Sequence, residues 1–238
     1  MRVAVVENTA RTPHGLVGAA LREAGATVTV FRPFAEDGLP TDLAEHDALI
    51  VLGGAQSAVD DARHPYLPAL ARLMRDYCEA GKAVLGICLG AQLLARGYGA
   101  KNIVGAATEF GWHGVELTED GRSDAVLSAF GTEKFDAFQW HDDTFTLPEG
   151  AVHLGRNATA RNQAFRIGRA GYGTQFHFEA GSAVVRTWTE QFAEQTEEKH
   201  PGWVAAHEEI IARHGPSADA LGLALARAWI GLIRPASG

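Results

Sequence analysis

The first hundred residues alternate between short apolar runs and stretches with helical periodicity. Apolar runs rich in β-branched residues predict strands at 2–7, 27–31 and 47–52, and from residue 83 onward. Apolar positions at helical spacing predict helices at 16–24 and 65–80, and a glycine follows each. Strands that alternate with helices and are apolar on both faces indicate a mostly parallel sheet covered by helices on both sides.

The pattern changes after Gly99. Short strands between Gly, Asp and Asn turns are predicted at 115–117, 135–140, 151–154, 164–167 and 172–178. We expect them to be partly antiparallel, either extending the same sheet or forming a small ribbon beside it. Helical periodicity returns at 183–198, 203–214 and 218–233, with breaks at Pro201 and Gly215-Pro216.

The chain shows no internal repeat, low-complexity tract or linker. We therefore expect one α/β domain over residues 1–238, with a core at about 1–198 and a C-terminal helical extension at about 199–238.

Composition narrows the class of protein. Hydrophobic residues make up 46% and charged residues 21%, which is typical of a soluble globular chain. A net charge of −8, without a cluster of Lys and Arg, argues against a nucleic-acid surface. Two cysteines cannot form a disulfide framework, and they fit a reducing compartment. No apolar run is long enough to cross a membrane, and the first one is too short for a signal peptide, so we expect a cytoplasmic protein.

Residues 83–95 suggest a reactive site, because a buried strand is followed there by Gly86, Cys88 and Gly90 and then by helix-forming residues. Glycines beside a Cys let the backbone turn sharply and hold the thiol at the tip of the turn. The positive N-terminal end of the next helix would favour the thiolate. The alternative is a small, inert Cys buried at a strand–helix junction, and the stretch alone leaves both interpretations open.

A nucleophilic Cys needs a base, and the best candidate is His177 followed by Glu179. If the segment is a strand, the two side chains project from the same face, and the carboxylate would orient the imidazole. The alternative is a half-buried strand with an ordinary histidine and a solvent-facing acid.

Glycines at the end of the preceding strand could complete the site. Gly53-Gly54 ends the predicted strand 47–52, and ligands in parallel sheets collect at such carboxyl ends. Their amides, with the amide of Leu89, could form an oxyanion hole. A simple tight turn is the commoner role of such a Gly pair.

Together, three blocks resemble the class I, triad-type glutamine amidotransferase family, and within it the stand-alone GMP-synthase-like glutaminase domains. The blocks are 86–92, 52–54 and 175–179; they occur in the family's order, and the resemblance covers about residues 45–180. It implies the family's flavodoxin-like, three-layer α/β/α fold, with a central, mostly parallel mixed sheet.

The resemblance also implies roles for individual residues. Cys88 is the nucleophile, His177 the general base and acid, and Glu179 its orienting partner, while the Gly54 and Leu89 amides form the oxyanion hole. The substrate-binding residues it implies are Gly53, Gln92, His141, Asp142 and Asp143.

Two blocks qualify this assignment. Phe178 stands where the family usually has Pro between the His and the Glu, but the spacing is unchanged. His141 and Asp143 match the family's His-x-Asp, and a free carboxylate there could receive the α-ammonium of glutamine. Metal binding by 141–143 is the rival, but adjacent side chains on a strand diverge and no second cluster completes a site. Glu109 could lie near this pocket or be an exposed turn acid.

On this resemblance the chain is an enzyme that hydrolyses the side-chain amide of glutamine, or of another γ-glutamyl compound, without a metal or organic cofactor. The last sixty residues are too few for a synthetase domain, and the chain contains no Gly-x-x-x-x-Gly-Lys-Ser/Thr loop. Either a separate synthetase subunit receives the ammonia, or the protein acts alone as a γ-glutamyl hydrolase or peptidase. A third possibility is a catalytically silent relative with a regulatory or binding role. The presence of Cys88, His177 and Glu179 argues against it. The sequence leaves the oligomeric state open, a homo-oligomer included.

Overall fold

A mixed sheet runs through the centre of the computed structural model, which describes residues 1–35 and 37–235. Within those residues it has nine strands in the order β2-β1-β3-β4-β11-β10-β9-β6-β7. The parallel strands are β1 (Arg2–Val6), β2 (Thr27–Phe31), β3 (Ala48–Val51), β4 (Ala83–Ile87) and β11 (Gly171–Thr174). The first four agree closely with the strands predicted from apolar runs.

The strands after residue 99 extend the same sheet, which was one of the two predicted arrangements. Each pairs antiparallel with its neighbours: β6 (Glu109–Leu117), β7 (Lys134–His141), β9 (Val152–Arg156) and β10 (Ala164–Ile167). A separate two-stranded ribbon pairs β5 (Asn102–Ile103) with β8 (Thr144–Phe145).

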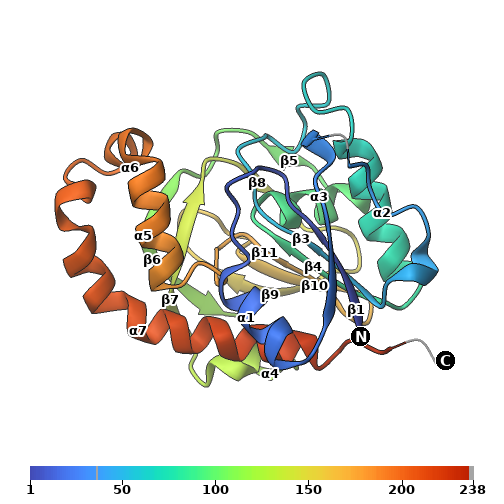
Figure 1. The fold of residues 1–238 in the computed structure, drawn as a ribbon. Helices are drawn as coiled ribbons and strands as arrows, with labels where there is room; N and C mark the ends of the chain where they lie inside the picture. The colour runs from blue at the N-terminus through green and yellow to red at the C-terminus, as the bar shows by residue number, and fades with distance from the viewer. Residues whose placement is uncertain (36, 236–238) are drawn as a thin grey trace.

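Helices cover both faces of the sheet because successive side chains of a strand point to opposite sides. Val3 and Val5 of β1 pack with α1 (Gly15–Glu23) and α7 (Trp203–Ile230). Ala4 and Val6 pack on the other side with α2 (Leu67–Glu79) and α3 (Leu89–Gly97). The remaining helices are α4 (Glu119–Ser123), α5 (Ser182–Gln191) and α6 (Ala193–Lys199), shown with the others in Figure 1.

The predicted break at Gly215-Pro216 is wrong, because α7 continues through Pro216. Proline cannot donate to the carbonyl four residues earlier, and it usually kinks or ends a helix. Here both halves of α7 are held by packing: Ile211 joins an aromatic cluster, whereas Leu225 and Trp229 join the main core. In Figure 1, α7 descends beside α5 and then runs below the sheet past α1.

Two other predicted boundaries also differ from the structure. The strand predicted at 172–178 stops at Thr174, so His177 and Glu179 lie in the turn that follows β11. The helix predicted at 183–198 is divided at Phe192 into α5 and α6. Both differences bring residues toward the carboxyl ends of the parallel strands.

Candidate active site

Cys88 lies in a sharp turn between β4 and α3. Its φ of 53° and ψ of −108° make it, among the described residues, the one non-glycine with positive φ. Such backbone conformations cost about 1–3 kcal/mol and persist only where the surroundings impose them. The Cys88 N–H donates to the Thr174 carbonyl of β11 at 2.8 Å, which helps to hold the turn.

The glycines around Cys88 are required by close backbone contacts. A Cβ on Gly86 would overlap the Gly90 carbonyl, and a Cβ on Gly90 would overlap the Val51 carbonyl of β3. The turn can therefore fold back on β4 and pack against β3 only if both positions lack side chains. This is the local reason for the Gly-x-Cys-x-Gly pattern.

His177 and Glu179 form a buried pair. His177 Nδ1 and Glu179 Oε1 are 2.6 Å apart, and Glu179 is fully buried. The His177 N–H donates to the Phe138 carbonyl of β7 at 2.8 Å, and the Leu16 N–H at the start of α1 donates to the Glu179 carbonyl at 2.9 Å. The predicted pairing thus exists, although a turn anchored on both sides produces it rather than alternation along a strand.

The electrostatics of this pair favour a protonated imidazole. Burial by itself lowers the pKa of His177, but the carboxylate of Glu179 and the sulfur of Cys88 raise it, and the net result is a pKa of about 10. His177 therefore carries a positive charge at neutral pH.

Gly53 lies close to both Cys88 and His177. A Cβ on Gly53 would lie 2.9 Å from His177 Cε1 and 3.5 Å from Cys88 Cβ, so only a glycine leaves room for both. The Cys88 thiol also lies 3.8 Å from the Trp140 carbonyl, and Gln175 Nε2 donates to its sulfur at 3.6 Å.

Gly54 lies beside the Leu89 side chain and Asn8. A Cβ on Gly54 would lie 3.1 Å from Leu89 Cδ2 and 2.8 Å from Asn8 Cβ. The Leu89 N–H belongs to the first turn of α3, where N–H groups have no acceptor inside the helix.

The predicted acidic group at 141–143 is not free in this structure. Lys199 Nζ donates to both Asp142 oxygens at 2.5 and 2.7 Å, and Thr108 donates to one of them. Asp143 accepts from Ser57 Oγ at 2.8 Å and from the Gly105 N–H at 2.9 Å. Any substrate ammonium would therefore have to share or displace these partners.

His141 and Gln92 both bind the Asp143 backbone. His141 Nδ1 lies 3.1 Å from the Asp143 carbonyl, and Gln92 Nε2 lies 3.4 Å from the same oxygen. The other nitrogen of His141 contacts Glu109 Oε2 at 3.2 Å. Glu109 is 3% exposed and so is not an exposed turn acid; it also accepts from Gln163 and Asn157.

These residues surround a cavity of about 710 Å³. The cavity is lined by every residue predicted for the site except Glu179, which is buried behind His177. Its lining includes a polar wall, formed by Gln56, Ser57, Gln92 and Asp143, and an aromatic wall, formed by the mutually packed Trp140, Trp188 and Phe192. The aromatic wall is not evident from the sequence, because Trp188 has the helical spacing of a core residue and Phe192 marks an unpredicted helix end.

The family model of class-I glutamine amidotransferases matches residues 6–194. This chain belongs to that family. The glutamine amidotransferase-like protein YfeJ of Salmonella typhimurium is 32% identical over 65% of this chain and 66% of its own length. A glutamine-hydrolysing GMP synthase subunit of Natronomonas pharaonis is 27% identical over 79% of this chain and 95% of its own.

The solved glutamine amidotransferase of Thermotoga maritima superposes with a TM-score of 0.87 at 26% identity, over 98% of both chains. The predicted α/β fold, with its mostly parallel mixed sheet, is thereby confirmed. The match to the GMP synthase of Rhodopseudomonas palustris covers only 27% of that protein, so this amidotransferase-family chain corresponds to part of such enzymes.

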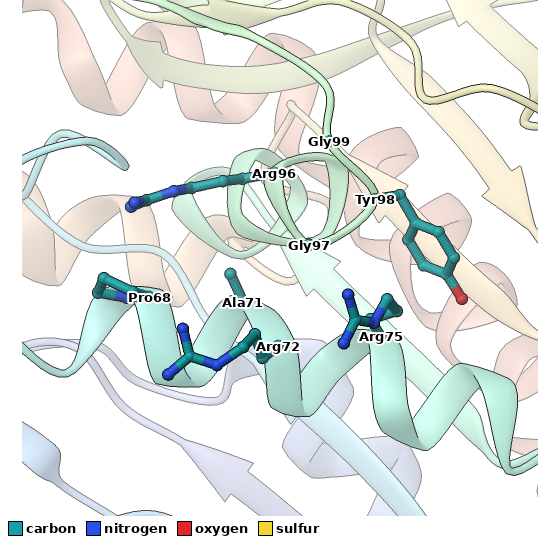
Figure 2. A pocket seen from close by; sticks show the side chains of 8 residues that line it. All are labelled: Pro68, Ala71, Arg72, Arg75, Arg96, Gly97, Tyr98 and Gly99. Carbon is teal, nitrogen blue, oxygen red and sulfur yellow. The ribbon is translucent and has the colours of Figure 1, made fainter.

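A second cavity, of about 570 Å³, lies between α2 and the end of α3 (Figure 2). It carries arginines rather than any predicted site residue. Arg96 is bound by both Asp61 oxygens at 2.7 Å, and Arg75 lies 3.2 Å from Asp76. Much of its positive charge is therefore neutralised within the protein.

Residues 1–35 and 37–235 contain no group of three or more His, Cys, Asp and Glu side chains placed to hold a metal ion. The same residues contain no helix long and apolar enough to cross a membrane.

Proposed function

We propose that this protein hydrolyses the side-chain amide of glutamine through a γ-glutamyl thioester on Cys88. The observation that supports this most directly is the strained turn of Cys88 beside the buried His177–Glu179 pair. Membership of the amidotransferase family supports the same chemistry.

In this proposal the Cys88 sulfur attacks the amide carbon, and the Gly54 and Leu89 amides bind the resulting oxyanion. The charged imidazole of His177 donates its proton to the leaving nitrogen, the C–N bond breaks, and ammonia departs. Water then gives a proton to His177 and attacks the thioester, which releases glutamate and restores the sulfur. Glu179 stabilises the charged imidazole throughout.

The amino-acid end of glutamine would bind against the polar wall, where Gly53, Gln92, His141, Asp142 and Asp143 stand. The ammonia would serve a separate synthetase subunit. The similarity to a protein named as one subunit of a GMP synthase, rather than as the whole enzyme, supports this proposal.

The test is intact-mass measurement of the purified protein after brief exposure to glutamine. We expect a γ-glutamyl adduct on the wild type, none on Cys88→Ala, and at least about a thousandfold loss of glutamate release in that variant. Cys78→Ala is the matched control, since Cys78 is buried in α2 and burial raises the pKa of its thiol to about 12. Wild-type glutamate release by Cys88→Ala would refute the proposal.

A second candidate is a γ-glutamyl hydrolase or peptidase that needs no partner. The size of the cavity favours it, because pockets of about 300–1,000 Å³ accept ligands larger than a single amino acid. Turnover of γ-glutamyl dipeptides by the purified chain, with little turnover of glutamine, would distinguish this function from a partnered glutaminase.

A further inference from the structure

The lining of the cavity around Cys88 includes two chemically distinct groups of side chains. On the polar side, Ser57 and Gln92 are both hydrogen-bonded to Asp143. Trp140, Trp188 and Phe192 form the continuous aromatic wall. The ring centroid of Trp140 lies 5.6 Å from that of Trp188 and 5.7 Å from that of Phe192, both edge-on.

The aromatic wall adjoins the proton donor. The His177 ring packs edge-on against Trp188 with centroids 5.2 Å apart, and the Trp140 carbonyl faces the Cys88 thiol. In the proposed mechanism the nitrogen that leaves as the thioester forms takes its proton from His177, so the leaving amine is released next to Trp188. Ammonia has no carbon atoms that could pack against the aromatic wall.

The wall is open to a ligand rather than sealed in the core. Trp140 and Phe192 are half-buried and line the cavity, in contrast to Trp203 and Trp229, which are fully buried. Aromatic side chains placed in this way bind a flat ring through offset or edge-on contacts.

A cationic side chain of the cavity lining, Arg11, lies against the Phe192 ring of the aromatic wall. The Arg11 guanidinium lies 5.5 Å from the centroid of the Phe192 ring, and within the described part of the chain it has no carboxylate partner. The other basic side chain of the rim, Lys199, is bound to Asp142, and the rim also carries the acidic Glu198. Arg11 is therefore the group available to a ligand carboxylate.

From this arrangement we infer that the leaving group is an aromatic amino acid, and that the substrates are γ-glutamyl amides such as γ-glutamyl-phenylalanine. The inference rests on the proposed thioester chemistry and deepens the second candidate function, in which the amine that leaves is not ammonia and no synthetase subunit is needed. Cys88 sulfur bonds to the γ-carbonyl carbon, the C–N bond breaks, and the amino group of phenylalanine leaves with the proton of His177. Water then cleaves the thioester, so the products are glutamate and phenylalanine.

Four substrates separate the contributions of the wall and the cation. The amine that leaves carries neither a ring nor a carboxylate in glutamine, only a carboxylate in γ-glutamyl-alanine, and only a ring in γ-glutamyl-phenethylamide. In γ-glutamyl-phenylalanine it carries both. We expect kcat/KM of the purified chain to be highest for γ-glutamyl-phenylalanine, by about tenfold over γ-glutamyl-alanine.

Two variants assign these preferences to residues. Phe192→Ala should remove most of the preference for phenylalanine over alanine, and Arg11→Gln should reduce the preference for phenylalanine over phenethylamine by about threefold. The matched controls are Phe34→Ala and Arg63→Gln, which alter exposed side chains outside the cavity and should leave both ratios unchanged.

The outcomes separate the two proposals. A thioester formed from glutamine, with equal kcat/KM for the alanine and phenylalanine compounds, would overturn the inference and leave the thioester mechanism standing. Ratios that Phe192→Ala and Arg11→Gln do not change would also overturn it. The absence of any thioester with all four compounds would refute both.

Discussion

At the scale of single residues, the site depends on glycines, because other residues would place a Cβ where the chain packs closely. Gly53 leaves room for Cys88 and His177, and Gly86 and Gly90 allow the turn that holds the thiol. The three positions have different neighbours, yet each would clash with a methyl group. The glycines of the sequence motif are thus constraints on packing before they are constraints on chemistry.

Gly90→Ala tests this at the closest contact, with the Val51 carbonyl. Because a buried backbone oxygen cannot move away without shifting β3, we expect a loss of about 2–3 kcal/mol in the free energy of unfolding, measured with urea. Gly114→Ala is the control, since its Cβ would have its nearest contact at 3.8 Å. Equal stability of the two variants would contradict this account.

The raised pKa of His177 predicts a pH profile. In the proposed mechanism the protonated imidazole is the acid for the leaving amine, so kcat/KM should hold at neutral pH and fall as the pH rises through about 10. Glu179→Gln removes the neighbouring negative charge that most raises this pKa. The alkaline limb of the variant should therefore move toward about 6.5, the ordinary histidine value. If kcat/KM fell at the same pH in both proteins, the charge of Glu179 would not be what raises the pKa of His177.

At the scale of elements, the sequence predicted the parallel strands well because apolar runs between turn residues have few other structures available. It missed the end of β11, since residues 175–178 look like a continued strand and only the contact of His177 with Phe138, distant in sequence, ends it. It missed the continuity of α7 because proline disfavours a helix locally, and the packing that overrides this preference is not local. The aromatic wall was missed for the same reason.

Helix α7 also supports the turn that holds His177 and Glu179. A Cβ on Gly222 would overlap the Phe178 carbonyl, and Asp219 accepts from the Ser182 N–H at 2.7 Å and from its hydroxyl at 2.8 Å. The two residues fix both the turn and the start of α5.

Gly222→Ala should therefore displace the turn, lowering kcat for glutamine by about tenfold or more. A Cβ on Gly231, which follows the same helix, would meet carbonyls of that helix, the nearest at 3.3 Å, and no part of the turn, so Gly231→Ala should leave kcat near that of the wild type. Steady-state kinetics on folded fractions, verified by circular dichroism, would compare them; equal kcat values would rule out support of the turn by Gly222.

At the scale of the whole molecule, α7 lies beyond residues 6–194, the region that the family model matches, yet it is part of the main core. Trp229 is fully buried, and its indole N–H donates to the Val84 carbonyl of β4 at 3.3 Å. The division into a core at 1–198 and an extension at 199–238 stays a prediction, but α7 of the extension packs against α1 and β4.

Trp229→Ala should consequently lower the free energy of unfolding by about 3–5 kcal/mol. Val204→Ala, on the same helix but 40% exposed, should change it by less than about 1 kcal/mol. Chemical denaturation of both variants is the measurement. A small effect at Trp229 would mean that α7 is an accessory to the fold.

The contact between α1 and α7 also constrains the order in which the protein can assemble during synthesis. Arg227 binds Glu23 at 2.8 Å, and Gly222 meets the turn that follows β11. The ribosome therefore releases Cys88 and then His177 well before the helix that fixes their relative positions. A nascent chain that has reached residue 200 holds Cys88, His177 and Glu179, but the turn that carries the last two lacks support from α7, so we expect the finished site to form only after residue 222 has emerged.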